Sequence, residues 1–438
     1  MPVVRPFRAL RYDPSVAGPL EELIAPPYDV VSPTEREELL GRSPRNVIRV
    51  ELPAAEPGEE PDAKYRHAAR TLAAWRSDGT LRKDPRPSLY VYEESYCPPG
   101  SETPRSQRGV FCRLRLEPFG PGSGVRPHER TLSGPKEDRY RLLRATGTNT
   151  SPVVGLFDDA SGRVGSFVER VVAGTPAADA TDDDGVRHRL WAVAEADDAE
   201  FGAVADALGA GPITIADGHH RYETALRYRD ERRMTRSCEE DPAFDYVLAL
   251  LLEASQQLTI LPTHRIVQGL SAAEQGALRG RLLELFEVED GGRSVSARDL
   301  AAGWLARFET EGGGQGLFGF LGPDGALVVR ARRAAFEPLL AAVPPAVRGL
   351  DVTLLGVALE RLLGIGPAQV AEGRVAYTHD AGEAAAAVGA AGDVAFLLAP
   401  TPVRAVIDVA AAGAVMPQKS TYFYPKAVTG LVLNPHEW

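Results

Sequence analysis

The sequence predicts a mixed α/β protein of 438 residues, in which helices and strands both occur along the chain. Short runs rich in β-branched and aromatic residues, such as 88–96, have the composition of strands. Segments with apolar residues at every third or fourth position, such as 62–78, have the period of a helix that buries one face. A chain of this length is expected to hold two or three domains. We divide it into three stretches, which are residues 1–107, 108–268 and 269–438.

Residues 1–107 are predicted to form an N-terminal α/β region. The double proline at 26–27 excludes a helix there, because proline lacks an N–H donor and restricts the residue before it. Ser32 and Glu35 have the spacing of a capping box, so a helix should begin here and end near Gly41. The other elements expected are a strand-like run at 2–10, a helix at 62–78, a strand at 88–96 and a loop at 97–108.

Residues 108–268 contain the clearest chemical signal of the chain. A strand at 211–216 leads directly into Asp217 and Gly218, and a helix is expected to follow and to reach about Arg233. Strand, glycine turn and helix therefore follow one another without a loop. The other elements expected are strands at 109–116, 151–157, 186–194, 246–253 and 258–264, helices at 135–145 and 201–208, and a loop at 118–127.

Residues 269–438 are predicted to form a C-terminal α/β region in which helices and strands alternate. A hairpin is expected at 316–330, because two strand-like runs flank a turn of Pro, Asp and Gly at 323–325. The other elements expected are helices at 271–285, 352–363, 381–389 and 403–412, and a strand at 394–398.

The overall charge and the cysteines exclude several classes of protein. The formal net charge is −11, which argues against a general nucleic-acid binder. No segment has the roughly 18 consecutive apolar residues of a membrane-spanning helix, and no apolar signal core opens the sequence. Cys97, Cys112 and Cys238 are odd in number and far apart, so no disulfide framework is expected and a cytoplasmic location fits best.

The segment Asp217-Gly218-His219-His220-Arg221 is the strongest candidate for a binding site. The first turn of a helix favours anions through its unpaired N–H groups and its dipole, and three potential cations stand at this turn. Gly218 allows the backbone to approach a ligand closely, and Arg221 can donate to phosphate oxygens. Asp217 could order a histidine or hold Mg²⁺ through water. The alternative is that Asp217 caps the helix and the basic residues lie on a solvated surface.

A second candidate is the pair His128 and Glu129, ahead of a charged helix. A carboxylate beside a histidine can accept a hydroxyl proton, so the pair is a candidate acid/base site. The equally weighted alternative is that the pair belongs to a cluster of ion pairs on the surface. The pair is not part of HExxH, which disfavours a zinc-protease site. Near the C-terminus, Lys419 and Lys426 could add phosphate contacts, and a buried aromatic turn is the equally weighted alternative.

Two further segments are weaker candidates. Tyr28 and Asp29 follow the double proline, in a rigid loop that we expect to face the site rather than to brace the N-terminus. His264 and Arg265 end a predicted strand, where a surface pair is the expectation and a place in the same pocket is the alternative. The chain contains neither GxxxxGK[ST] nor GxGxxG ahead of a helix, so a P-loop kinase and a dinucleotide fold are disfavoured.

These motifs carry a resemblance to known families. Over about residues 108–268, the HE motif, the charged helix after it and PITIADGHHRYETA resemble the ParB/sulfiredoxin-like superfamily, in particular its free-serine kinase branch. The whole chain, from RPFRALRY through IAPPYDVVSP to MPQKSTYFYPK, is similar to the bacterial and archaeal family labelled domain of unknown function ten-fifteen. The resemblance implies a ParB/sulfiredoxin-like nucleotide- and phosphate-binding core at 108–268, with α/β flanking regions on both sides.

The resemblance to the serine kinases also implies roles for single residues. The stretch Asp217-Gly218-His219-His220-Arg221 would bind the phosphates of a nucleotide, with Lys419 as a further contact. Glu129 would take the hydroxyl proton of serine, with His128 beside it and His220 as a further catalytic candidate. The two motifs stand farther apart in this sequence than in the compact kinases, which implies an insertion around 158–184.

The expected function is that of a cytoplasmic phosphotransferase. It would move phosphate between ADP or ATP and serine, phosphoserine or a similar small hydroxylated metabolite, with Mg²⁺ as cofactor. Two alternatives remain open, namely a phosphatase or nucleotide hydrolase, in which water replaces the hydroxyl acceptor, and a regulator that binds nucleotide without catalysis. Nucleic acid and membranes are not expected as partners.

Overall fold

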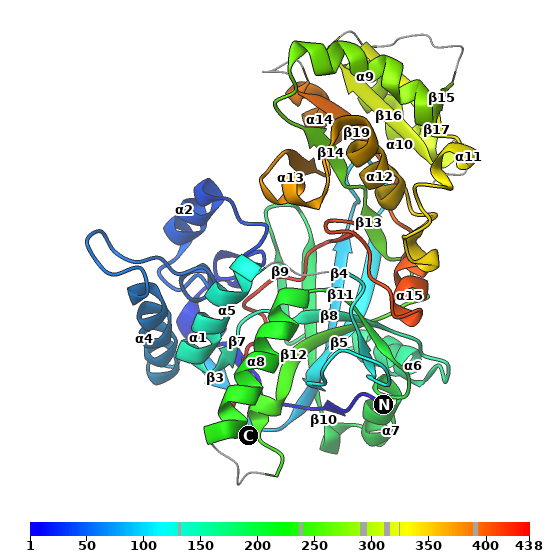
Figure 1. Cartoon of the computed structure of the whole chain (residues 1–438). Helices are drawn as coiled ribbons and strands as arrows, with labels where there is room; N and C mark the ends of the chain where they lie inside the picture. Colours follow the sequence, from blue (N-terminus) through cyan, green and yellow to red (C-terminus); the bar gives the residue numbers. More distant parts are fainter. Residues whose placement is uncertain (130–132, 236–239, 290–295, 311–315, 324, 389–392) are drawn as a thin grey trace. The chain divides into compact units, whose positions relative to one another are not determined.

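The computed structural model describes residues 1–129, 133–235, 240–289, 296–310, 316–323, 325–388 and 393–438. The contacts within the chain divide it into two compact units. Unit 1 consists of Met1–Pro127, Thr131–Thr259 and Tyr424–Trp438, and unit 2 consists of His128–Arg130 and Ile260–Phe423. Both units contain helices and a sheet, so the predicted mixed α/β class is confirmed (Figure 1).

Unit 1 is built around one mixed sheet (Figure 1). Its strands lie in the order β6, β11, β8, β12, β5, β4, β10 and β9, and β1 pairs with β5 beside this path. The pairs β6–β11 and β8–β12 are parallel, and the other neighbours are antiparallel. The strands are β1 Val4–Arg5, β4 Ser88–Tyr96, β5 Arg105–Arg115, β6 Val125–Arg126, β8 Val153–Phe157, β9 Ala178–Thr181, β10 Arg187–Ala194, β11 Ile213–Asp217 and β12 Tyr246–Glu253.

Helices pack against this sheet, and α5 (Ser133–Thr146) and α8 (His219–Thr235) lie side by side on it (Figure 1). The shared core joins Tyr140 of α5 and Tyr222 of α8 to Ile213 and Ile215 of β11. The other helices of unit 1 are α1 Pro14–Ala17, α2 Pro33–Arg42, α3 Ile48–Glu51, α4 Ala63–Ser77, α6 Arg163–Val172 and α7 Phe201–Leu208, with 3-10 turns at Leu20–Glu22, Glu195–Asp197 and Ala243–Asp245.

Unit 2 holds a second sheet, whose strand pairs are all antiparallel. The strand order is β15, β17, β16, β19, β14 and β18. Alternate side chains of β16 point to opposite faces of this sheet. Phe318 and Phe320 pack with α9 and α12, whereas Leu317 and Leu321 pack with α10. The strands are β14 His264–Val267, β15 Phe286–Val288, β16 Leu317–Gly322, β17 Gly325–Ala331, β18 Val375–Thr378 and β19 Val394–Leu397.

The helices of unit 2 therefore cover both faces of its sheet. They are α9 Ala272–Leu285, α10 Ala297–Thr310, α11 Arg333–Phe336, α12 Asp351–Leu363, α13 Pro367–Ala371, α14 Ala381–Ala387 and α15 Val403–Ala411, with a 3-10 turn at Pro345–Val347. The remaining short strands of the chain are β2 Leu10–Tyr12, β3 Leu81–Lys83, β7 Thr148–Asn149, β13 Thr259–Leu261, β20 Tyr422–Tyr424 and β21 Asn434–Pro435.

Local sequence signals predicted many of these elements. Ser32 accepts from the Glu35 N–H and the Glu35 side chain accepts from the Ser32 N–H, so the predicted capping box of α2 is confirmed. The single strand predicted at 258–264 was wrong, because β13 and β14 are separate strands on either side of Pro262. The predicted loop at 97–108 was too long, since β5 already begins at Arg105. The segment around 158–184, expected as an insertion, forms α6 and β9 of unit 1.

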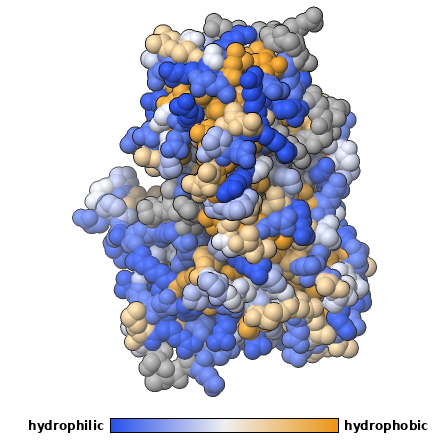
Figure 2. All heavy atoms as spheres, turned by 45° about the vertical axis from the view of Figure 1, so that its right-hand side comes forward, coloured by the Kyte–Doolittle hydropathy of each residue, from blue (hydrophilic) through white to orange (hydrophobic). Residues whose placement is uncertain are grey.

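The surface and the cysteines point to no further candidate site in the part of the chain that the structure describes. In the described part of the chain, no helix is long and apolar enough to cross a membrane. The face seen in Figure 2 carries mainly hydrophilic residues, with smaller hydrophobic areas between them. Cys97 is exposed, and Cys112 is buried in the core of unit 1, where burial raises the pKa of its thiol. Cys238 lies outside the described residues.

Candidate functional site

The junction of β11 and α8 has the predicted strand, turn and helix. β11 ends at Asp217, Gly218 has a φ of +85°, and α8 begins at His219. A Cβ on Gly218 would lie 3.0 Å from the Arg221 Nε atom and 3.2 Å from the Val153 Cα atom. Both the left-handed backbone and the close approach therefore favour glycine at this position.

Asp217 lies between two cations. Its Oδ1 atom accepts a hydrogen bond of 2.7 Å from Lys426 Nζ, and its Oδ2 atom accepts one from Arg221. The exposed fractions of the three side chains are small: 16% for Asp217, 10% for Arg221 and 12% for Lys426. Two largely buried cations thus share one carboxylate at the start of α8.

The charges around Asp217 keep it ionised. Burial raises the pKa of its carboxyl group, but the positive charges of Lys426 and Arg221 lower this pKa by more than burial raises it. The resulting pKa lies well below the ordinary value. The carboxylate therefore binds the two cations in its ionised form. His219 and His220 are half-buried in the first turn of α8, and His219 also lowers the pKa of Asp217.

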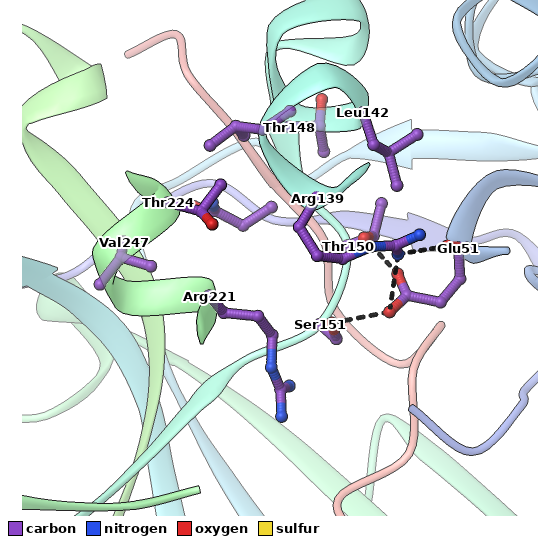
Figure 3. Close-up of a pocket in the computed structure, with 11 residues that line it drawn as sticks. Glu51, Arg139, Leu142, Thr148, Thr150, Ser151, Arg221, Thr224 and Val247 are labelled. Carbon is purple, nitrogen blue, oxygen red and sulfur yellow. Dashed lines mark hydrogen bonds and ion pairs between the residues drawn. The ribbon is translucent and has the colours of Figure 1, made fainter. Parts of the chain in front are cut away.

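A small cavity of about 40 Å³ lies beside Arg221 in unit 1 (Figure 3). Glu51 is its most buried charged residue, with an exposed fraction of 1%. The Glu51 carboxylate accepts hydrogen bonds from the hydroxyl groups of Thr150 and Ser151, and Arg139 donates to the Glu51 carbonyl oxygen at 2.6 Å. A space of this size admits a few water molecules and is too small for a nucleotide. The cavity therefore borders the candidate site without being the nucleotide pocket.

The loop after the double proline joins this group of residues, as expected. The Arg139 guanidinium carbon lies 4.1 Å from the centre of the Tyr28 ring. Burial raises the pKa of the Tyr28 hydroxyl to about 12. Burial lowers the pKa of Arg221, but the negative charges of Asp217 and then of Asp29 raise it, and the resulting pKa lies above the ordinary value. Sequence reasoning missed Glu51, which follows the mostly apolar stretch 47–50, and it considered Arg139 only as part of the charged helix at 135–145.

His128 and Glu129 belong to unit 2, where they contact the segment Met416–Thr421. The Lys419 backbone N–H donates to Glu129 Oε1 at 2.7 Å, and His128 Nε2 lies 2.9 Å from Thr421 Oγ1. His128 is fully buried. Arg130 and Thr131, which complete this motif in the sequence, lie outside the described residues. The structure thus brings Lys419, expected as a phosphate contact, to Glu129.

The predicted site residues therefore fall into two groups. The first group lies in unit 1 and consists of residues 217–221 together with Lys426. The second group lies in unit 2 and consists of His128, Glu129 and Lys419. The acid/base role of His128 and Glu129 and the phosphate role of Lys419 remain predictions from their motifs.

A bound metal would need additional ligands. Both oxygens of Asp217 already accept hydrogen bonds from cations. Among the residues that the structure describes, no group of three or more His, Cys, Asp or Glu side chains is arranged to hold a metal ion. Because Mg²⁺ keeps several waters and commonly takes phosphate oxygens as ligands, a nucleotide would supply part of its coordination shell.

Comparisons with known proteins give one family and several similar structures. No curated protein matches the sequence. Among solved structures, the chain is similar to a free serine kinase in complex with AMP, at 13% identity and a TM-score of 0.35, with 72% of this chain and 86% of that chain covered. It is also similar to a conserved hypothetical protein from Pyrococcus furiosus, at 11% identity and a TM-score of 0.32, with 72% and 90% covered. A third similar structure is SbnI with C-terminal truncation from Staphylococcus aureus, at 11% identity and a TM-score of 0.34, with 70% and 83% covered.

Likenesses at this level of identity do not establish a shared activity. The family comparison is more extensive, because residues 4–353 match the model described as "Protein of unknown function (DUF1015)". Since this match spans most of the 438 residues, the chain belongs to the DUF1015 family of proteins of unknown function.

Proposed function

We propose that this protein is a phosphotransferase that binds the phosphates of ADP or ATP at the start of α8. The observation that carries the proposal is the pair of buried cations, Arg221 and Lys426, on the single carboxylate of Asp217. Phosphoryl transfer requires positive charge around the transferred group far more than covalent help from the protein. The first turn of a helix adds N–H groups and the positive end of the helix dipole.

The reaction proposed moves phosphate between the nucleotide and serine, phosphoserine or a similar small hydroxylated metabolite. This choice of acceptor rests on the resemblance of the DGHHR and HE motifs to the free-serine kinase branch. In the kinase direction, the serine oxygen forms a bond to the γ-phosphorus of ATP, the bond to the β-phosphate oxygen breaks, and ADP leaves. Glu129 is proposed to take the serine hydroxyl proton, with His128 beside it, and Mg²⁺ is proposed to accompany the nucleotide.

The test is to incubate the purified full chain with phosphoserine, ADP and Mg²⁺ and to measure ATP and serine. We expect both products in equal amounts. For Glu129→Gln we expect a rate at least about 100-fold lower, because in this direction Glu129 would return the proton to the serine oxygen, and general acid–base catalysis contributes about 10²–10⁴-fold. Glu137→Gln is the control, since Glu137 is an exposed carboxylate that pairs with Arg141 and Arg227. Release of inorganic phosphate without formation of ATP would instead identify a hydrolase. Nucleotide binding without turnover, unchanged in Glu129→Gln, would identify a regulator.

A further inference from the structure

Arg265 is a buried cation in the sheet of unit 2. It stands on β14, between β18 and β19, and its exposed fraction is 6%. The expectation of a surface pair for His264 and Arg265 was therefore wrong, because both side chains are buried within unit 2. The Arg265 guanidinium donates to the carbonyl oxygen of Thr263 and, at 3.0 Å, to that of Lys419, and it lies 4.8 Å from the centre of the Tyr377 ring.

The environment of Arg265 is unusual for an arginine. Among the described residues, no carboxylate oxygen lies within 4.0 Å of its nitrogen atoms. Burial lowers the pKa of Arg265 to about 10, so the side chain is still charged at neutral pH. A buried cation whose hydrogen bonds go to carbonyl groups, and which otherwise lies over the Tyr377 ring, costs free energy of desolvation. Such a residue is expected to have a task other than stabilising the fold.

Arg265 donates a hydrogen bond to Lys419, a residue with a strained backbone. Lys419 has a φ of +56°, and it is the one non-glycine residue with a positive φ in the described part of the chain. Residues with a Cβ avoid this conformation unless their surroundings impose it. The carbonyl oxygen of Lys419 accepts from Arg265, while its N–H donates to Glu129 Oε1 at 2.7 Å. One residue in the left-handed conformation thus links the buried cation to the carboxylate.

The rest of the segment Met416–Thr421 is fixed by bonds within unit 2. The Met416 N–H donates to the carbonyl oxygen of His128 at 2.7 Å, and the Thr401 hydroxyl donates to that of Ser420 at 2.8 Å. These bonds hold the two ends of the segment, and within it the Ser420 hydroxyl also donates to the carbonyl oxygen of Pro417. The carbonyl group of Lys419 itself is bound by Arg265.

We propose that Arg265 is a positioning residue for Glu129. By binding the Lys419 carbonyl group, it holds Lys419 in the left-handed conformation and so directs the Lys419 N–H at the Glu129 carboxylate. The proposal rests on the proposed function, in which Glu129 takes the proton of the hydroxylated substrate. Arg265 itself touches no reacting atom in this account.

The test compares Arg265→Met and Arg265→Lys with Arg281→Met. Arg281 is the control for the loss of a bond from arginine to a carbonyl oxygen in unit 2, since it is an exposed residue that donates to Leu362 at 2.8 Å. We expect Arg265→Met to lower kcat about 10- to 100-fold with an unchanged KM for the nucleotide, Arg265→Lys to recover part of kcat, and Arg281→Met to leave kcat unchanged.

Hydrogen exchange of the Lys419 amide separates this proposal from the proposed function, because it requires no turnover. In Arg265→Met we expect this amide to exchange at least about tenfold faster, and Arg281→Met should leave it protected. Unchanged exchange in a folded Arg265→Met variant would overturn the positioning role whether or not the protein transfers phosphate. An equal loss of kcat from Arg265→Met in the wild-type and Glu129→Gln backgrounds would also overturn it. If the wild-type protein has no transfer activity while exchange responds as expected, only the proposed function fails.

Discussion

Replacement of Asp217 with Asn should lower the free energy of unfolding at pH 7 by about 3–5 kcal/mol. The carboxylate is the shared partner of Arg221 and Lys426, and all three side chains are largely buried. Asn is nearly isosteric with Asp but carries no charge, so it would leave two buried cations without their counter-ion. Breaking a buried ion pair in this way is far more costly than removing an exposed one.

The same carboxylate predicts a dependence of stability on pH. The folded-state pKa of Asp217 lies well below the ordinary value of 3.8, because the positive charges of Lys426 and Arg221 outweigh the effect of burial, which raises it. Its contribution to stability is therefore complete above pH values near 3.8 and is lost as the pH falls below that value toward the depressed folded pKa. Asp217→Asn should lack this component of acid sensitivity.

Urea denaturation followed by tryptophan fluorescence, at several pH values, measures both effects. Asp197→Asn is a suitable control, because Asp197 pairs with Arg86 on the surface and both side chains are about half exposed. That variant should change the free energy of unfolding by about 1 kcal/mol or less. A stability of Asp217→Asn within that range would show that Asp217 is not the counter-ion of two buried cations.

Replacement of Arg113 with Met should lower the free energy of unfolding by about 2–4 kcal/mol and should detach the C-terminal segment of unit 1. Arg113 is fully buried and donates to Asn434 Oδ1 and to the carbonyl oxygens of Pro435 and Glu437, at 2.7–2.8 Å. Met fills a similar volume but donates no hydrogen bond, so these acceptors would have to separate from the sheet to reach water.

Release of this segment should also affect the candidate site, because Lys426 lies in the same stretch, Tyr424–Trp438. We expect faster hydrogen exchange across residues 426–436 in Arg113→Met and weaker binding of ADP. Arg76→Met is the control, since Arg76 pairs with Glu437 at the surface, where both side chains are about 40% exposed. Exchange in Arg113→Met that matches this control would contradict the anchoring role of Arg113.

The sequence was most informative where structure depends on neighbouring residues. Strand, glycine turn and helix around Asp217 follow from an apolar run, a glycine and a helical pattern within one short stretch. The capping box of Ser32 and Glu35 likewise joins residues only three positions apart. These features could be predicted because their physical causes are local.

Contacts between distant segments could not be predicted in the same way. Lys426 was considered as a phosphate contact, but its bond to Asp217 spans 209 positions of the sequence. The bond from Thr150 to Glu51 spans 99 positions, and no periodicity of either segment specifies the other. The burial of Arg265 was missed for a related reason, since a single charged residue at the end of a strand is more often exposed.

Binding of ADP by the wild-type protein, by Lys426→Met and by Lys83→Met tests the central claim most directly. Lys83 is a matched control, because its side chain is 18% exposed and it also binds the C-terminal segment, through the Trp438 carbonyl oxygen at 2.8 Å. Isothermal titration calorimetry should show that Lys426→Met binds ADP about 10- to 100-fold more weakly than the wild-type protein, while Lys83→Met keeps nearly the wild-type affinity. Equal affinity in the wild-type protein and Lys426→Met, or no binding of ADP by the wild-type protein, would contradict a phosphate site at the start of α8.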